Sequence, residues 1–133
     1  LDFNGGGISY LITGGADLAH DFASLLVTNN TTLILDQYPL LVESLVIGSD
    51  TVFNSNGNDI EITDTFVIDD GGTFEFDGDE TIILPEGMIG VGGTVIINGS
   101  GGSVLPFGYE YYNLIIAAGI WNLTHDVLVN NNF

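Results

Sequence analysis

The sequence contains no lysine and no arginine, although it has 18 acidic side chains in 133 residues, so its formal net charge is −18. Proteins bind nucleic acids mainly through phosphate contacts made by lysine and arginine, so we expect no nucleic-acid partner. A Walker-type phosphate site and a basic patch for anionic lipids are excluded for the same reason. Apolar burial and backbone hydrogen bonds, rather than ion pairs, must therefore hold the fold together.

Cysteine is also absent, which excludes disulfides, thiolate metal sites and a cysteine nucleophile. Even the longest apolar runs, such as residues 114–118, are short, so no membrane insertion is expected. Alanine is scarce, whereas there are 19 glycines and many β-branched residues, and hydrophobic residues make up 45% of the chain. This composition supports a sizeable core and predicts an all-β fold.

A repeat runs through the middle of the chain. Short apolar segments that open with threonine recur at Thr32, Thr51, Thr73 and Thr94. The threonines are 19, 22 and 21 residues apart, and each follows an apolar triplet and a turn. After the middle two segments comes a third short strand, Ile60–Ile62 or Ile82–Leu84.

A period near 21 residues is typical of a solenoid, in which stacked coils share one core. We therefore predict a parallel β-helix (β-solenoid) of about six short coils with three strands per coil. A β-sandwich is the alternative, but its strand groups need not resemble one another as these do. We expect residues 1–133 to form a single solenoid segment of a longer repetitive chain.

Alternation within the short strands predicts which side chains face the interior. Glu75 should point outward, and Asn54 should lie on the inner side of its coil, bonded to a neighbouring turn. The side chains predicted to point inward are Phe74, Phe76, Val95, Ile97 and Trp121.

Two acidic clusters occur in turn-like stretches and are the candidate metal sites. Their members are Asp69, Asp70, Asp77, Asp79 and Glu80. Clustered carboxylates at turns suit Ca²⁺, which takes six to eight oxygen ligands, although neither stretch fits the EF-hand pattern. The alternative is that aspartate and glycine serve only the backbone geometry of solvated turns.

Other candidate chemistry is weaker, and we assign no catalytic role. Paired carboxylates serve glycoside hydrolases, but Asp69 and Asp70 are adjacent and would face opposite sides of a strand. His20 and His125 each precede an aspartate, yet no serine motif accompanies them, so we interpret both as turn residues. Aromatic residues that suit a sugar ligand are Trp121, Tyr109, Tyr111 and Tyr112.

The segment Phe107–Asn130 resembles a repeat of very large cell-surface proteins of the Bacteroidota. That repeat contains Tyr-Tyr-Asn-Leu-x-Ile, a glycine turn and an Asp-x-x-Val-Asn stretch, and the likeness covers residues 88–132 well and residues 3–30 weakly. Family members are similar to adhesins and gliding-associated filaments exported by the type IX system. Asp50-Thr51-Val52 also resembles the O-glycosylation pattern of those bacteria.

The resemblance implies an extracellular, cell-surface location and a structural or adhesive role in a stalk or filament. The partners it implies are neighbouring repeats or copies of the same chain, together with surface carbohydrate. A self-assembling filament subunit completed by strand exchange is the first alternative. A β-helix that binds or degrades polysaccharide is the second.

Overall fold

The computed structural model describes residues 1–13, 21–85, 92–99, 110–121 and 127–133. The strands form two sheets in which all neighbours are parallel, so the predicted fold class, a parallel β-solenoid, is confirmed with about five turns. The five-stranded sheet contains β1 (Asp2–Phe3), β3 (Asp21–Val27), β5 (Leu40–Ile47), β7 (Ile60–Ile68) and β9 (Ile82–Ile83). The seven-stranded sheet contains β2 (Gly7–Ile12), β4 (Thr31–Gln37), β6 (Val52–Asn54), β8 (Thr73–Phe76), β10 (Thr94–Ile97), β11 (Glu110–Ile116) and β12 (Leu128–Asn132).

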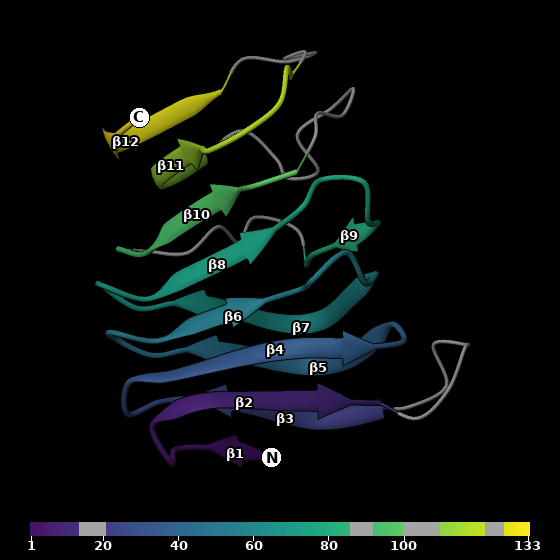
Figure 1. Cartoon of the computed structure of the whole chain (residues 1–133). Coiled ribbons are helices and arrows are strands. Elements are labelled where there is room, and N and C mark those ends of the chain that lie inside the picture. Colours follow the sequence, from purple (N-terminus) through teal and green to yellow (C-terminus); the bar gives the residue numbers. More distant parts are fainter. Residues whose placement is uncertain (14–20, 86–91, 100–109, 122–126) are drawn as a thin grey trace.

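The chain winds between the two sheets and rises by one strand with each turn (Figure 1). In the N-terminal part, odd-numbered strands lie in one sheet and even-numbered strands in the other. Each strand therefore pairs with its counterpart one coil away, at the spacing of about 4.8 Å that neighbouring strands keep. The described residues include no helix long and apolar enough to cross a membrane.

The sequence predicts three strands per coil, whereas the coils of the structure have two, one in each sheet. β7 joins Ile60–Ile62 and Phe66–Ile68, which the sequence had suggested as separate strands, into one extended segment. The register with β5 shifts between Val42 and Ser44, where one residue of β5 lies opposite two of β7. Because no glycine or proline interrupts this stretch, the backbone bulges and continues instead of turning.

The strand register differs at Thr51 from the sequence repeat, in which Thr51 is equivalent to Thr32, Thr73 and Thr94. Thr32 and Thr73 both pair with Val52, so β6 begins one residue after Thr51. Asn54 consequently lies opposite Glu75 on the outer side and is half-buried, and the inward residue of this coil is Phe53. The expectation that Asn54 faces the interior was wrong because Thr51 belongs to the turn, not to the strand.

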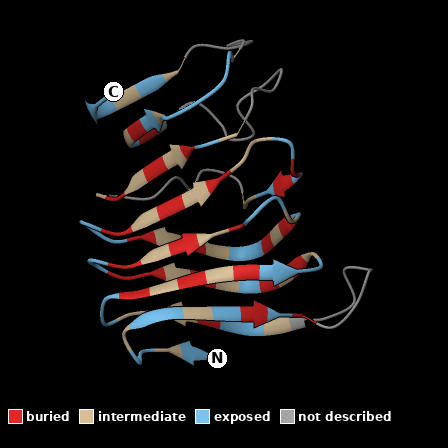
Figure 2. Ribbon diagram, viewed as in Figure 1, coloured by how far each residue is buried: buried red, intermediate tan, exposed pale blue. Residues whose placement is uncertain are grey.

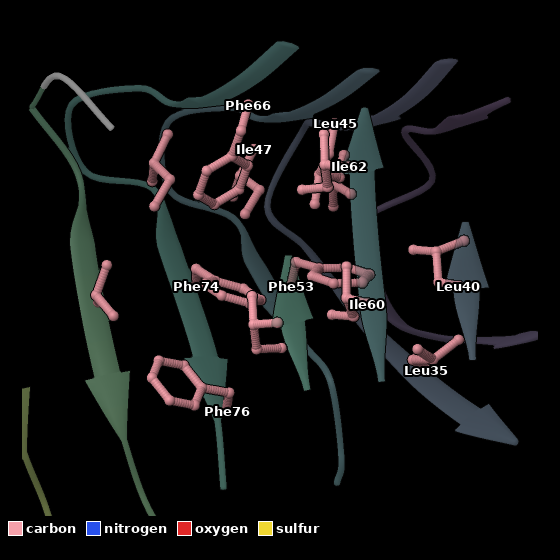
Figure 3. Close-up of a cluster of buried hydrophobic side chains, with 14 of the residues drawn as sticks. Leu35, Leu40, Leu45, Ile47, Phe53, Ile60, Ile62, Phe66, Phe74 and Phe76 are labelled. Carbon is pink, nitrogen blue, oxygen red and sulfur yellow. The ribbon is translucent and has the colours of Figure 1, made fainter. Parts of the chain in front are cut away.

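The interior is a continuous apolar core between the two sheets (Figure 2). The predicted inward residues Phe74, Phe76, Val95 and Ile97 are buried, which confirms their orientation. The ring of Phe74 lies 5.9 Å from that of Phe53 on the next coil and 5.5 Å from that of Phe66 on the opposite sheet (Figure 3). These ring contacts link adjacent coils and opposite sheets in one cluster.

Candidate functional site

The first acidic cluster forms the turn between β7 and β8. Asp69 and Asp70 are exposed, and the backbone N–H of Asp69 donates to the carbonyl of Ile47 on the coil below at 2.9 Å. The N–H of Gly72 donates back to the Asp69 carbonyl at 2.8 Å, and Gly71 has a φ of 83°. The geometry of this turn thus requires glycine at Gly71 and is made by the backbone, while the two carboxylates point to solvent.

The second acidic cluster forms the corner between β8 and β9, and its central residue is Glu80. This side chain is buried, and its carboxylate accepts hydrogen bonds from the backbone N–H groups of Asp77 and Gly78. It also accepts one from the hydroxyl of Ser55, on the coil below. The Glu80 carboxylate therefore closes its own turn and fastens that turn to its neighbour, which satisfies a buried charge with charge-assisted hydrogen bonds.

Asp77 lies beside this network and has a raised pKa. Partial burial is the largest cause, followed by the negative charges of Glu80, Asp79 and Glu75. No lysine or arginine exists anywhere in the chain to offset these like charges. The folded corner consequently disfavours the deprotonated form of the Asp77 carboxyl group.

The structure does not combine the two predicted acidic clusters into one site. They lie at opposite ends of β8, with the four residues of that strand between them. Within the described ranges, no group of three or more histidine, aspartate or glutamate side chains is arranged to hold a metal ion. Calcium binding stays a prediction. Asp69 and Asp70 are the candidate ligands at one corner, and Asp77 and Asp79 are those at the other, because Glu80 is already engaged.

The aromatic residues do not form a shared sugar platform in the described part of the chain. Trp121 is half-buried, its indole N–H donates to the Ala118 carbonyl at 2.9 Å, and its ring covers Gly78 at the acidic corner. Tyr111 is fully buried, and burial raises its pKa, whereas Tyr112 is partly exposed. His20, His125 and Tyr109 lie outside the described residues.

Thr51 is not available as a modification site in the folded chain. Its side chain is 1% exposed, and its hydroxyl donates to the carbonyl of Gly48 at 2.6 Å. A second acceptor, the Val27 carbonyl one coil below, lies at 3.3 Å. Although Asp50-Thr51-Val52 matches a glycosylation pattern, the Thr51 hydroxyl closes a turn in the folded chain.

The outer face of the seven-stranded sheet carries regular rows of side chains. We define this outer face as two rows of side chains that run across β2, β4, β6, β8, β10 and β11 in register. The first row is Ile8, Thr32, Val52, Thr73, Thr94 and Asn113, and the second is Tyr10, Ile34, Asn54, Glu75, Ile96 and Ile115. Glu75 is the single charged residue among these positions, and the amide of Asn98 donates to it at 2.9 Å.

The chemistry of the outer face suits neutral ligands. Aliphatic groups, hydroxyls and amides occur together on it, and a flat polysaccharide chain meets such groups through apolar contact and hydrogen bonds. Phosphate or carboxylate ligands would meet no cationic side chain there.

Sequence reasoning missed the polar side chains that fasten successive coils. Besides Ser55, the amide of Asn58 donates to the Leu35 carbonyl one coil below at 2.9 Å. Asn113 donates to the Thr94 hydroxyl at 3.2 Å and accepts from the amide of Asn131 at 2.9 Å. The available signal was the recurrence of asparagine and serine at the strand ends of successive repeats, which marks stacked turns.

Comparisons with known proteins do not assign the chain to a family. No protein-family model matches the chain. Neither the curated proteins nor the solved structures contain a significant match.

Proposed function

We propose that this chain is a structural segment of an extracellular surface stalk or filament, a role that includes adhesion through its outer face. The observation that carries the proposal is the parallel pairing of each described strand with its counterpart one coil away. A stack built in this way grows along one axis, and each coil adds length without changing the ones before it. Such a rod sets a distance between two points, which is the mechanical task of a stalk.

The energetics of the stack suit a load-bearing spacer. Successive coils are joined by backbone hydrogen bonds in both sheets and by the polar side chains that link successive turns. The core between them is continuous from Leu11 to Leu114, so no coil buries its apolar side chains alone. Local damage to one coil is therefore resisted by the coils on either side.

The charge and the sequence resemblance support an extracellular setting. A net charge of −18 with no cationic side chain keeps copies apart and opposes nonspecific association. The resemblance to large repetitive surface proteins of the Bacteroidota points in the same direction. The proposed partners are accordingly neighbouring repeats of the same polypeptide and surface carbohydrate.

The spacer role is tested by adding coils. Because Val52 pairs with Thr73, a second copy of residues 52–72 inserted before Thr73 should add one complete coil. We expect each inserted copy to lengthen the particle by about 4.8 Å in small-angle X-ray scattering, with cooperative unfolding retained. Insertions of the same number of residues in scrambled order are the control, and unchanged length or loss of folding with the true repeat would refute the spacer role.

The proposed location is tested on intact cells of the source organism. An antibody against this segment should label whole cells, and externally added proteinase K should abolish that signal. Labelling that requires lysis would contradict a surface location. Binding of the chain to immobilised polysaccharides, with Ile34→Asp and Val52→Asp on the outer face as variants, tests adhesion separately.

A second candidate, a self-assembling filament subunit, is favoured by one observation. Among the described strands, β2 pairs only with β4 and β12 pairs only with β11. The seven-stranded sheet thus ends in two edges that have no described partner.

A further inference from the structure

The outer face has a nearly uncharged strip across its four inner strands, β4, β6, β8 and β10. Each of these strands contributes two side chains, which we call together the axial track because they run along the axis of the stack. Its members, all half-buried, are Thr32, Val52, Thr73 and Thr94 in the first row and Ile34, Asn54, Glu75 and Ile96 in the second. Each of these strands has a described neighbour on both sides, so further repeats of the polypeptide would extend the track and not cover it.

The first row of the axial track presents hydroxyl groups. The hydroxyls of Thr32 and Thr73 donate to no described residue, whereas the Thr51 hydroxyl in the adjacent turn donates to backbone carbonyls. The Thr94 hydroxyl accepts from the amide of Asn113 at 3.2 Å, which leaves its own proton available. Because β-branched side chains have restricted rotamers, these hydroxyls are held in a regular row and keep hydrogen-bonding capacity for a ligand.

The second row of the axial track is apolar at both ends and polar between them. Ile34 and Ile96 present aliphatic surface. Between them, the amide oxygen of Asn54 accepts a backbone N–H of the following turn at 2.6 Å, and the carboxylate of Glu75 accepts from the amide of Asn98 at 2.9 Å. A ligand that fits both rows therefore needs apolar surface and hydroxyl groups in the same molecule.

Negative charge borders the axial track at both ends of its strands. Asp50 and Asp70 are exposed just before β6 and β8, and Asp36 and Asp79 are exposed near the opposite ends of β4 and β8. An anionic polymer on the track would meet these carboxylates with no lysine or arginine to pair with it. An uncharged polymer meets no such repulsion, and its hydroxyls can donate to the bordering carboxylates. The charge pattern therefore selects an uncharged ligand.

The dimensions of the axial track suit one extended chain. Three coil steps separate β4 from β10, or about 14 Å, and the two rows lie two residues apart along each strand, or about 7 Å. A stable protein–protein interface buries about 800 Å² on each partner, which is far more than this strip offers. A single narrow polymer, in contrast, can follow the track for its whole length.

We propose that the axial track binds an uncharged linear polysaccharide whose chain lies along the axis of the stack, across the strands. The sugar hydroxyls bond to the first row, and the apolar faces of the sugar rings lie against the isoleucines of the second row. The inference rests on the adhesive role proposed above and adds the class of ligand and its direction. Each coil adds two positions, so a longer track contacts a longer stretch of polysaccharide.

The test is isothermal titration calorimetry of the full 133-residue chain with neutral oligosaccharides of increasing length. The probes are the cello-, laminari-, manno- and malto-oligosaccharide series, each compared with a carboxylated form of the same sugar. We expect the affinity for at least one neutral series to rise with oligosaccharide length and to level off once the ligand is longer than the track. The carboxylated form should bind at least about tenfold more weakly at low salt, because nothing on the track neutralises its charge.

Variants test which side chains make the contact. Thr73→Val combined with Thr94→Val removes two hydroxyls while keeping the β-branched shape, and the affinity should fall about tenfold. The matched control is Thr65→Val, which removes a hydroxyl from the five-stranded sheet and should bind like wild type. Circular dichroism and thermal melting verify that each variant stays folded.

The direction of the ligand is tested with the chain that carries one inserted copy of residues 52–72. Its track is one coil longer, so the oligosaccharide length at which the affinity levels off should increase. An unchanged length in a folded insertion chain would contradict a polysaccharide that lies along the axis.

Three further results would overturn the proposal. They are no binding of any neutral series, equal binding of the neutral and carboxylated forms at low salt, and equal weakening by Thr65→Val and by the double variant. The stalk role would survive each of them, because scattering measures the added length without a ligand. Failure of the insertion chain to lengthen would instead refute the stalk role and leave the titration of the original chain valid.

Discussion

The carboxylate of Glu80 accepts a hydrogen bond from the hydroxyl of Ser55, which lies 25 residues earlier and one coil below. The same carboxylate accepts the backbone N–H groups of Asp77 and Gly78. One buried acidic side chain therefore both closes a turn and joins two coils. In a protein without lysine or arginine, backbone amides and hydroxyls take the place of cationic partners.

Removal of this acceptor should destabilise the fold. Glu80→Ala leaves the Ser55 hydroxyl and two partly buried N–H groups without this acceptor, and we expect a loss of about 2–4 kcal/mol in the free energy of unfolding. Glu80→Gln retains an acceptor oxygen but not its charge, so its loss should be smaller. Urea denaturation measures both, and equal stability of wild type and Glu80→Ala would contradict the assigned role.

Glycine is required at position 99, where the backbone lies against the coil below. A Cβ atom at Gly99 would lie 1.6 Å from the carbonyl oxygen of Asp77 on the coil below. We expect Gly99→Ala to cost about 1–3 kcal/mol through forced separation of the coils. Gly5→Ala is the control, because a Cβ there meets nothing within 4 Å, and its melting temperature should stay close to that of wild type.

The raised pKa of Asp77 predicts a pH-dependent penalty. The folded state binds this proton more tightly than the unfolded chain, whose carboxyl has the ordinary value of 3.8. Asp77 therefore lowers stability at pH values above its folded pKa, and the penalty disappears as the pH falls below the ordinary value. Asp77→Asn should raise the melting temperature at pH 7 and give no such gain at pH 3.

The control for this comparison is Asp36→Asn, which removes the same charge from an exposed position on β4. The gain for Asp77→Asn at pH 7 should exceed that for Asp36→Asn. Equal gains would show that Asp77 responds only to the overall negative charge.

The acidic turns also lead to a prediction about metal ions. If the exposed carboxylates bind calcium as the sequence predicts, Ca²⁺ should raise the melting temperature more than Mg²⁺ does at equal concentration, and a chelator should reverse that increase. The increase should be smaller in Asp69→Asn/Asp70→Asn or in Asp79→Asn. Equal effects of the two ions would contradict calcium binding and leave these carboxylates as residues of solvated turns.

Much of the fold could be predicted from the sequence because repetition and alternation record stacking directly. The inward residues of β8 and β10 follow from alternation, and the solenoid follows from the similarity of successive segments. The register of β6 could not be read correctly, because Thr51 resembles Thr73 in sequence while its hydroxyl fastens a turn. Spacing held the clue: Thr32, Val52 and Thr73 are 20 and 21 residues apart, whereas Thr51 makes the intervals 19 and 22.

The acidic cluster was harder to interpret from the sequence. Nothing in the string Asp77-Gly78-Asp79-Glu80 shows that the last residue turns inward while its neighbours face solvent or the rim of the corner. That difference depends on Ser55, which lies one coil away and becomes a neighbour only when the register is known. Side-chain roles at coil corners therefore need the stacked structure, whereas strand orientation does not.

The central claim is that equivalent positions of successive coils lie above one another at a constant spacing, and pulsed electron paramagnetic resonance tests it most directly. Because the chain has no native cysteine, spin labels can be placed in pairs at Ile8→Cys with Thr73→Cys, Thr94→Cys or Asn113→Cys. These pairs span three, four and five coil steps of one row. We predict that the mean distance increases by about 4.8 Å from each pair to the next, and distances that do not increase with coil number would contradict the stacked solenoid.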